Sequence, residues 1–157
     1  MEWIGNLPHI GRLARTPYIE MMNKVYERLH ELGFTDMNSY YSVVFQFIGE
    51  GARMTDMAKK ASMTKQNMKY LLEQLQNMGY VERFEDKTDR RAVLFRLTQK
   101  GISYRDKAYE VIGEVELQWA NKIGIENMIQ LKKLLVQLND VINWDLTATL
   151  VLNIKLP

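Results

Sequence analysis

The order of patterns between residues 55 and 101 constrains the fold more than any other feature of the chain. Two short helical patterns, separated by a turn at residues 61–64, are followed by two strand patterns. Thr64 is a suitable N-cap for the second helix, and Gly79 is a suitable C-terminal stop. One face of that helix is apolar at steps of three and four residues, as a buried helix face requires: Met68, Leu71, Leu72, Leu75 and Met78.

Two strands are predicted after this helix, at residues 80–85 and 92–97, because apolar and polar residues alternate in the second of them. The residues that join them are polar and charged, as expected of an exposed hairpin tip. Thr55 is the expected N-cap of the first short helix, with Met57 and Ala58 facing inward. The segment is therefore predicted to form a helix-turn-helix followed by a β-hairpin wing.

Two helices are predicted before this segment. Thr16 offers an N-cap hydroxyl, and Pro17 suits the first helical position, so we expect a helix to begin there and residues 1–15 to be irregular. A second helix over residues 40–48 contains few polar side chains. A helix that is apolar nearly all round is buried on several sides, so this one should be central.

Two more helices are predicted after the wing. The first is capped by Thr98 and ends before Gly124. The second carries apolar residues at alternating steps of three and four, which is the spacing of a seam between paired helices: Met128, Leu131, Leu135, Leu138 and Ile142. The alternative is that these residues pack inside one subunit. The tail after residue 145 has a strand-like pattern.

Composition limits the compartment and the partners. The chain has 157 residues and no cysteine, which fits a reducing compartment, and we expect a cytoplasmic protein without a signal peptide or a membrane span. Residues 52–107 hold 13 Lys and Arg against 7 Asp and Glu, while the remainder holds 8 against 12. A basic centre between acidic ends indicates one anion-facing surface. A chance excess of solvated lysines explains the charges equally well.

The start of the second short helix has the side chains that a base-reading helix needs. Gln66 and Asn67 can bond adenine edges in two places, and Lys65 can bond guanine. Lys69 and Tyr70 come about one turn later, within reach of phosphates or bases. At the hairpin tip, Arg90 and Arg91 suit a narrow minor groove, and Asp89 could brace Arg91. Each position alone is a weak signal, so the prediction rests on their order and spacing.

The segment resembles the winged-helix core of the MarR family of bacterial transcription regulators. Asp89, Arg90 and Arg91, followed after five residues by Leu97 and Thr98 and then by Gly101, resemble that family's wing signature. The turn and helix from residue 62 to residue 79 are also similar to its recognition helix. Two helices before and two after match the family's architecture, so the resemblance covers nearly the whole chain except the ends.

The resemblance implies a homodimer that binds a pseudo-palindromic site on double-stranded DNA. It places six residues at the major groove or its phosphates: Thr64, Lys65, Gln66, Asn67, Lys69 and Tyr70. Arg91 would enter the minor groove with Asp89 bracing it, and Arg53 is a further phosphate candidate. Lys87 stands where the family often has proline, which affects the conformation of the tip but not its charge.

The same resemblance implies a division of the chain. Residues 1–50 would supply helices for the core and the dimer, and residues 52–101 the winged DNA-binding lobe. Residues 102–145 would supply the C-terminal dimerisation helices, and residues 146–157 a tail of unassigned structure. The expected fold is therefore mainly α with a small β-hairpin wing.

Regulators of this kind resemble ligand-operated switches, in which the ligand prefers the state that does not bind DNA. Without cysteine, thiol oxidation is excluded as the signal. His9 and His30 are the only histidines and lie in separate contexts, so metal sensing is not expected. A small apolar or aromatic effector remains, and its candidate pocket is a set of apolar and phenolic side chains on converging helices: Tyr18, Met22, Tyr26, Tyr40, Tyr41, Val44 and Trp119. The alternative, that these residues are core, is favoured for most of them.

Two other classes of function compete with DNA binding. An enzyme is not expected, because the chain has no thiol nucleophile and no phosphate-binding glycine loop, and no cofactor is predicted. His30 and Glu31 are adjacent and therefore face apart on a helix. The stronger rival is a winged helix that contacts only proteins. It predicts that Arg91 and Lys65 are dispensable for binding to duplex DNA.

Overall fold

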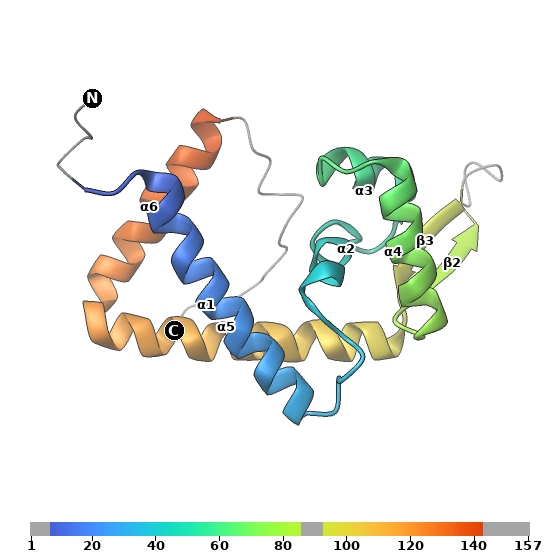
Figure 1. Cartoon of the computed structure of the whole chain (residues 1–157), viewed down its shortest axis with the longest axis horizontal. Helices are drawn as coiled ribbons and strands as arrows, with labels where there is room; N and C mark the ends of the chain where they lie inside the picture. The colour runs from blue at the N-terminus through green and yellow to red at the C-terminus, as the bar shows by residue number, and fades with distance from the viewer. Residues whose placement is uncertain (1–6, 86–92, 143–157) are drawn as a thin grey trace.

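The computed structural model describes residues 7–85 and 93–142. Its elements, in chain order, are α1 (Ile10–Glu31), the 3-10 helix η2 (Ser39–Tyr41), α2 (Ser42–Phe47), β1 (Ala52–Arg53), α3 (Met54–Lys60), α4 (Lys65–Asn77), β2 (Val81–Glu85), β3 (Val93–Leu97), α5 (Gln99–Ile123) and α6 (Ile125–Val141). Figure 1 shows the long helix α5 as a base, with α1 crossing it. The helix α6 rises from one end of α5, and α2 to α4 gather with the sheet over the other. The prediction of a mainly helical fold with a small wing is confirmed.

The hydrophobic core lies in the lobe formed by α2 to α4 and the sheet, and it extends along α5 to α1. Its most deeply buried side chains come from five elements or their ends and from the loop after α1: Val25, Leu29, Met37, Val44, Ile48, Met57, Met68, Leu71, Leu72, Leu75, Tyr80 and Val81. Burying one large apolar side chain contributes roughly 1.5–3 kcal/mol. Because four of these residues lie on α4, that helix is held firmly against the lobe.

The sheet has three antiparallel strands in the order β1-β3-β2. In the wing, Val81 pairs with Leu97 and Glu85 with Val93, which confirms the predicted hairpin to within a residue at the described ends. The strand β1 was not predicted. It is only two residues long, pairing Ala52 with Phe95, and is too short to produce a periodic pattern.

The first helix begins earlier than the sequence predicted. It starts at Ile10, with the His9 ring accepting a hydrogen bond from the backbone N–H of Arg12 at 3.2 Å. Pro17 therefore lies inside the helix, where it removes one backbone donor. The Thr16 hydroxyl does not cap a helix start but donates to the Arg12 carbonyl at 3.2 Å. The expectation that residues 10–15 are irregular was wrong, because the helix continues past a single lost hydrogen bond.

Two other boundaries also differ. The helix expected at residues 40–48 is a 3-10 turn followed by the short helix α2. The N-cap of α3 is Arg53 rather than Thr55, because Arg53 is extended and pairs with Leu94 in the sheet before the chain enters the helix. The predicted N-caps at Thr64 and Thr98 are confirmed, since each side-chain oxygen accepts a backbone hydrogen bond.

Candidate nucleic-acid interface

The first turns of α4 present an uninterrupted polar face. Thr64 accepts a hydrogen bond from the Asn67 backbone N–H at 3.1 Å, which satisfies one of the free donors at the helix start. The side chains expected to face DNA are all exposed: Thr64, Lys65, Gln66, Asn67, Lys69 and Tyr70. Tyr70, the largest of these side chains, is 53% exposed. These groups are therefore free to meet a ligand without any rearrangement of the core.

The opposite face of α4 is anchored in the lobe. Met68, Leu71 and Leu75 are fully buried, and Leu72 is 1% exposed. Moving any of these side chains into solvent would cost about 25 cal/mol of free energy for each Å² of apolar surface exposed. The inner side of the helix is thus fixed by packing, and its outer side carries hydrogen-bond donors and acceptors. A helix that binds in a DNA groove needs both features.

The turn before α4 sets how far its first residues project. Ala61 ends α3, and Ser62 takes a positive φ of 51°, which is uncommon for a residue other than glycine. The Met63 N–H donates to the Ala58 carbonyl at 2.9 Å, so the turn is closed by a backbone bond. The start of α4 is consequently presented at a defined angle to α3.

The electrostatics of this face favour an anion. The first turn of α4 has no acidic residue, and its N-terminus carries a partial positive charge. Lys69 makes only a loose exposed pair with Glu73, at 3.6 Å. Lys59 and Lys60 lie in the last turn of α3, and Arg53 is exposed at its start. The described residues therefore carry basic side chains at both ends of α3 and on α4.

The wing strands are braced by their own charges. Arg96 on β3 bonds Glu82 on β2 at 2.7 Å, and its guanidinium lies 4.9 Å from the centre of the Phe84 ring. Arg83 similarly lies over Phe95, at 5.6 Å. The predicted contacts at Lys87, Asp89, Arg90 and Arg91 fall outside the described residues.

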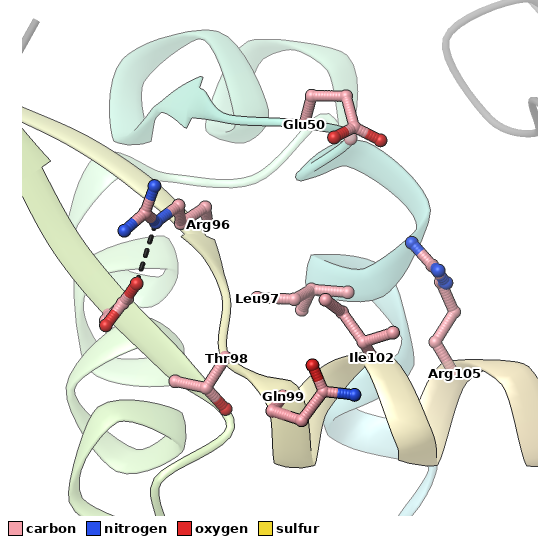
Figure 2. Close-up of a pocket in the computed structure, with 9 residues that line it drawn as sticks. Glu50, Arg96, Leu97, Thr98, Gln99, Ile102 and Arg105 are labelled. Atoms are coloured by element: carbon pink, nitrogen blue, oxygen red, sulfur yellow. Dashed lines mark hydrogen bonds and ion pairs between the residues drawn. The ribbon is translucent and has the colours of Figure 1, made fainter.

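A hollow of about 400 Å³ lies beside the wing, between the end of α2 and the start of α5. Figure 2 shows Arg96 at one side of it and Arg105 at the other, with Leu97 and Ile102 between them. Arg96 is already bonded to Glu82, and Arg105 donates to Asp106 at 2.8 Å. Its cations are therefore balanced internally. None of the seven residues predicted to line an effector pocket borders this hollow.

Those seven residues are divided between the surface and the core. Tyr18 and Tyr40 are exposed by more than half, whereas Val44 is fully buried. Met22, Tyr26, Tyr41 and Trp119 are intermediate. Burial raises the pKa of the Tyr26 phenol, which hydrogen-bonds Ser42 and Tyr104 and so links α1 to α2 and α5. The structure thus places Val44 in the core and leaves phenols along the junction of the helices.

The helix α6 has no buried residue in the single chain. Of the five predicted seam residues, Met128 and Leu135 are half-buried against their own chain. Leu131, Leu138 and Ile142 are 46%, 40% and 61% exposed. Further apolar side chains are exposed along the same helix: Ile125, Ile129, Leu134, Val136 and Val141.

Within residues 7–85 and 93–142, no three His, Cys, Asp or Glu side chains come close enough to share a metal ion. The helices in this part of the chain all lack the length or the hydropathy that crossing a bilayer requires.

Comparison with known proteins identifies the fold. Residues 50–101 match the family model of a winged helix DNA-binding domain. The reduced form of MarR from E. coli is similar, with a TM-score of 0.69 and 20% identity over 84% of this chain and 97% of that one. The fold is that of the MarR regulators. No curated protein sequence matches the chain significantly.

Two further solved structures are similar to this chain over most of their length. A mutant of E. coli MarR in complex with operator DNA gives a TM-score of 0.64 at 20% identity, over 82% of this chain and 92% of that one. The transcriptional regulator Tm0710 from Thermotoga maritima gives 0.58 at 20% identity, over 85% and 93%. The resemblance inferred from the wing signature is thereby confirmed for the fold.

Proposed function

We propose that the chain is a sequence-specific DNA-binding regulator of transcription that inserts the first half of α4 into a major groove. The observation that carries this proposal is the exposure of Lys65, Gln66 and Asn67 in succession on a helix whose other face is fully buried. This face combines amide and ammonium groups that can bond base edges with a helix N-terminus whose first turn has no acidic residue. The match to a winged helix DNA-binding domain and the MarR-like structure solved with operator DNA support the same conclusion.

Each side chain has a role that follows from its chemistry. Gln66 and Asn67 would form paired bonds with adenine, and Lys65 would bond guanine O6 or N7. Thr64 and the free N–H groups of the helix start would bind phosphate, as would Arg53. At the wing, Arg91 would enter the minor groove with Asp89 as a brace, and Arg90 and Lys87 would add positive charge at the tip.

The active species in this proposal is a homodimer on a pseudo-palindromic site. Monomeric proteins rarely expose an apolar surface as extended as that of α6 to water. Leu131, Leu138 and Ile142 have the heptad-like spacing of a helix–helix seam. Two lobes joined through α6 would present two α4 helices to half-sites about one helical turn apart, roughly 34 Å.

The finer proposal is a repressor that a small aromatic or apolar effector releases. It rests on the phenols near the junction of α1, α2 and α5, of which Tyr18 and Tyr40 are exposed and Tyr26 and Tyr41 partly so. Such an effector must bind the state that does not bind DNA more tightly. Its test is a panel of aromatic compounds in which a binder must both raise the melting temperature and lower DNA affinity.

The decisive experiment selects binding duplexes from a random-sequence library and measures affinity at two salt concentrations. We expect a dissociation constant on the order of 10⁻⁸ M or tighter that weakens steeply with salt. Gln66→Ala and Lys65→Ala should each weaken binding by about 1–3 kcal/mol and relax base preference at the position that the lost side chain contacts. Glu20→Ala, a change of an exposed residue on α1, is the control. Flat salt dependence and no enriched sequence would instead favour a winged helix that binds proteins.

A further inference from the structure

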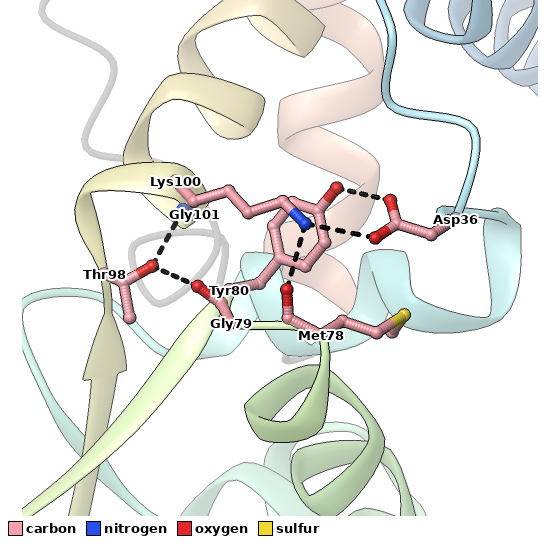
Figure 3. A network of polar contacts seen from close by, with 7 residues as sticks. All are labelled: Asp36, Met78, Gly79, Tyr80, Thr98, Lys100 and Gly101. Carbon is pink, nitrogen blue, oxygen red and sulfur yellow. Dashed lines mark hydrogen bonds and ion pairs between the residues drawn. The ribbon is translucent and has the colours of Figure 1, made fainter.

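One polar network joins the end of α4 to the start of α5. Figure 3 shows the Lys100 ammonium donating to Asp36 Oδ2 at 3.1 Å and to the Met78 carbonyl at 2.9 Å. The same ammonium lies 4.0 Å from the centre of the Tyr80 ring, and the Tyr80 hydroxyl donates to Asp36 Oδ1 at 2.6 Å. Asp36 comes from the loop after α1, so three segments distant in sequence meet at one lysine.

A second set of bonds reinforces the same junction. Thr98 donates its hydroxyl hydrogen to the Gly79 carbonyl at 2.6 Å and accepts from the Gly101 N–H at 3.1 Å. Its backbone N–H donates to the Tyr80 carbonyl at 3.0 Å. Gly101 packs so tightly that an added Cβ would lie 2.1 Å from that carbonyl oxygen. The first turn of α5 is therefore fixed to the residues that directly follow α4.

The network contributes more to geometry than to stability. The side chains of Lys100 and Asp36 are 45% and 40% exposed, and ion pairs at such sites contribute little to folding. Tyr80, in contrast, is fully buried and packs edge-on against Tyr104, with 5.6 Å between ring centres. The buried Tyr80 ring is thus fixed, and its hydroxyl positions Asp36 through a hydrogen bond. Asp36 and the Met78 carbonyl in turn position the Lys100 ammonium.

We infer that Asp36, Tyr80 and Lys100 are positioning residues, which fix the angle between α4 and α5 and so determine the half-site spacing that the dimer accepts. The inference rests on the proposed function. The helix α4 is about 20 Å long. A tilt of about 10° at its clamped C-terminal end moves its base-facing end by roughly 3.4 Å, the rise of one base pair. Because α5 leads directly into α6, such a tilt would change the distance between the two α4 helices of a dimer.

The test uses the full chain and duplexes in which two copies of the selected half-site lie 9 to 12 base pairs apart, about one helical turn. Affinity is measured for the wild type and for Asp36→Ala, Tyr80→Phe and Lys100→Met. We expect the ratio between the best spacing and one a base pair longer to fall by about two- to threefold in each variant, because an exposed network of this kind is worth less than about 1 kcal/mol. Binding to a duplex with a single half-site should change by less than about 1.5-fold. The double variant Asp36→Ala with Lys100→Met should be no worse than the more affected single variant, because both remove one network.

Two matched variants separate positioning from simple stabilisation. Lys107→Met removes an exposed lysine on the same helix, which pairs with Glu110, and should keep the wild-type spacing ratio. Lys100→Arg retains a cation over the Tyr80 ring and should also keep most of it. Equal loss at every spacing, or an unchanged ratio in variants that bind DNA, would overturn the inference while leaving the proposed function intact. A wild type that binds no duplex would overturn both.

Discussion

The winged lobe and the helix α6 differ in whether their apolar side chains are buried. On α4, every large aliphatic side chain except the half-buried Met78 at its C-cap is buried by its own chain, and the outer face is polar. On α6, the apolar side chains stay largely exposed, and no residue is buried. The lobe buries its apolar side chains together with those of α1 and α5, whereas α6 leaves its own uncovered in a single copy of the chain. The difference places the buried core in and around the lobe, and it leaves α6 as the surface on which the proposed dimer would form.

The largest expected difference between the lobe and α6 is in how much a buried and an exposed leucine contribute to the free energy of unfolding. Leu71 is fully buried, so Leu71→Ala should lower the free energy of unfolding by about 2–5 kcal/mol. Leu134→Ala on α6, where the side chain is 52% exposed, should change the unfolding of the single chain by less than about 0.5 kcal/mol. Urea denaturation below the concentration at which the protein associates measures both. Equal losses would mean that the two regions share one core.

The contact of α5 with the residues before β2 is the next test. In Gly101→Ala, the new Cβ would meet the Tyr80 carbonyl, and relieving this clash should cost about 1–3 kcal/mol. Gly113 lies on the same helix with open space around it, so Gly113→Ala should stabilise by up to about 1 kcal/mol. Opposite shifts of the melting temperature are therefore expected from the same substitution on one helix. A harmless Gly101→Ala would show that the close approach is not required.

A charge on α6 should separate assembly from folding. Leu138→Lys places an ammonium in the proposed seam, and we expect dimer affinity to fall at least tenfold, or about 1.4 kcal/mol, with little change in the unfolding of the monomer. Sedimentation equilibrium measures the first effect. Gln137→Lys, at an adjacent exposed position, adds the same charge outside the predicted seam as the control. If both variants associate like the wild type, α6 is not the interface.

The sequence was informative wherever a pattern repeats locally. Thr64 and the buried stripe ending at Leu75 determine both the cap and the inner face of α4, so its exposed side followed directly. The strand β1 could not be predicted, since two residues contain no period. The start of α1 was placed too late because Pro17 is compatible with a helix start and also with a helix interior.

The Asp36 network gave no signal in the sequence at all. Its hydrogen bonds join residues 44 and 64 positions apart, and each member alone is an ordinary surface or core side chain. Only the contact of the first turn of α5 with residues 78–80, directly after α4, brings them together. A helix angle that such contacts set is thus less accessible to sequence analysis than an exposed polar face on a regular helix.

The smallest expected effect concerns the pH dependence of this network. Partial burial raises the pKa of Asp36, but the hydrogen bonds from Tyr80 and Lys100 and the charge of Lys100 outweigh it, so the pKa lies below the ordinary aspartate value of about 3.9. A carboxyl group with a lowered pKa contributes stability above its unfolded-state pKa and loses it as the pH falls through the folded-state value. Asp36→Asn should therefore be less stable than the wild type at pH 6, and the difference should shrink below about pH 4.

The size of this effect is limited by solvent. Because the Asp36 side chain is 40% exposed, screening should hold the difference to a few tenths of a kcal/mol, or about 1 °C in melting temperature. Thermal unfolding followed by circular dichroism between pH 6 and pH 2.5 measures it. Lys100→Met should flatten the same pH dependence, since the aspartate then loses its cation. A gap between wild type and Asp36→Asn that stays constant across this range would show that the carboxylate gains nothing from its partners, and the junction would then be held by Thr98 and the close contact at Gly101 alone.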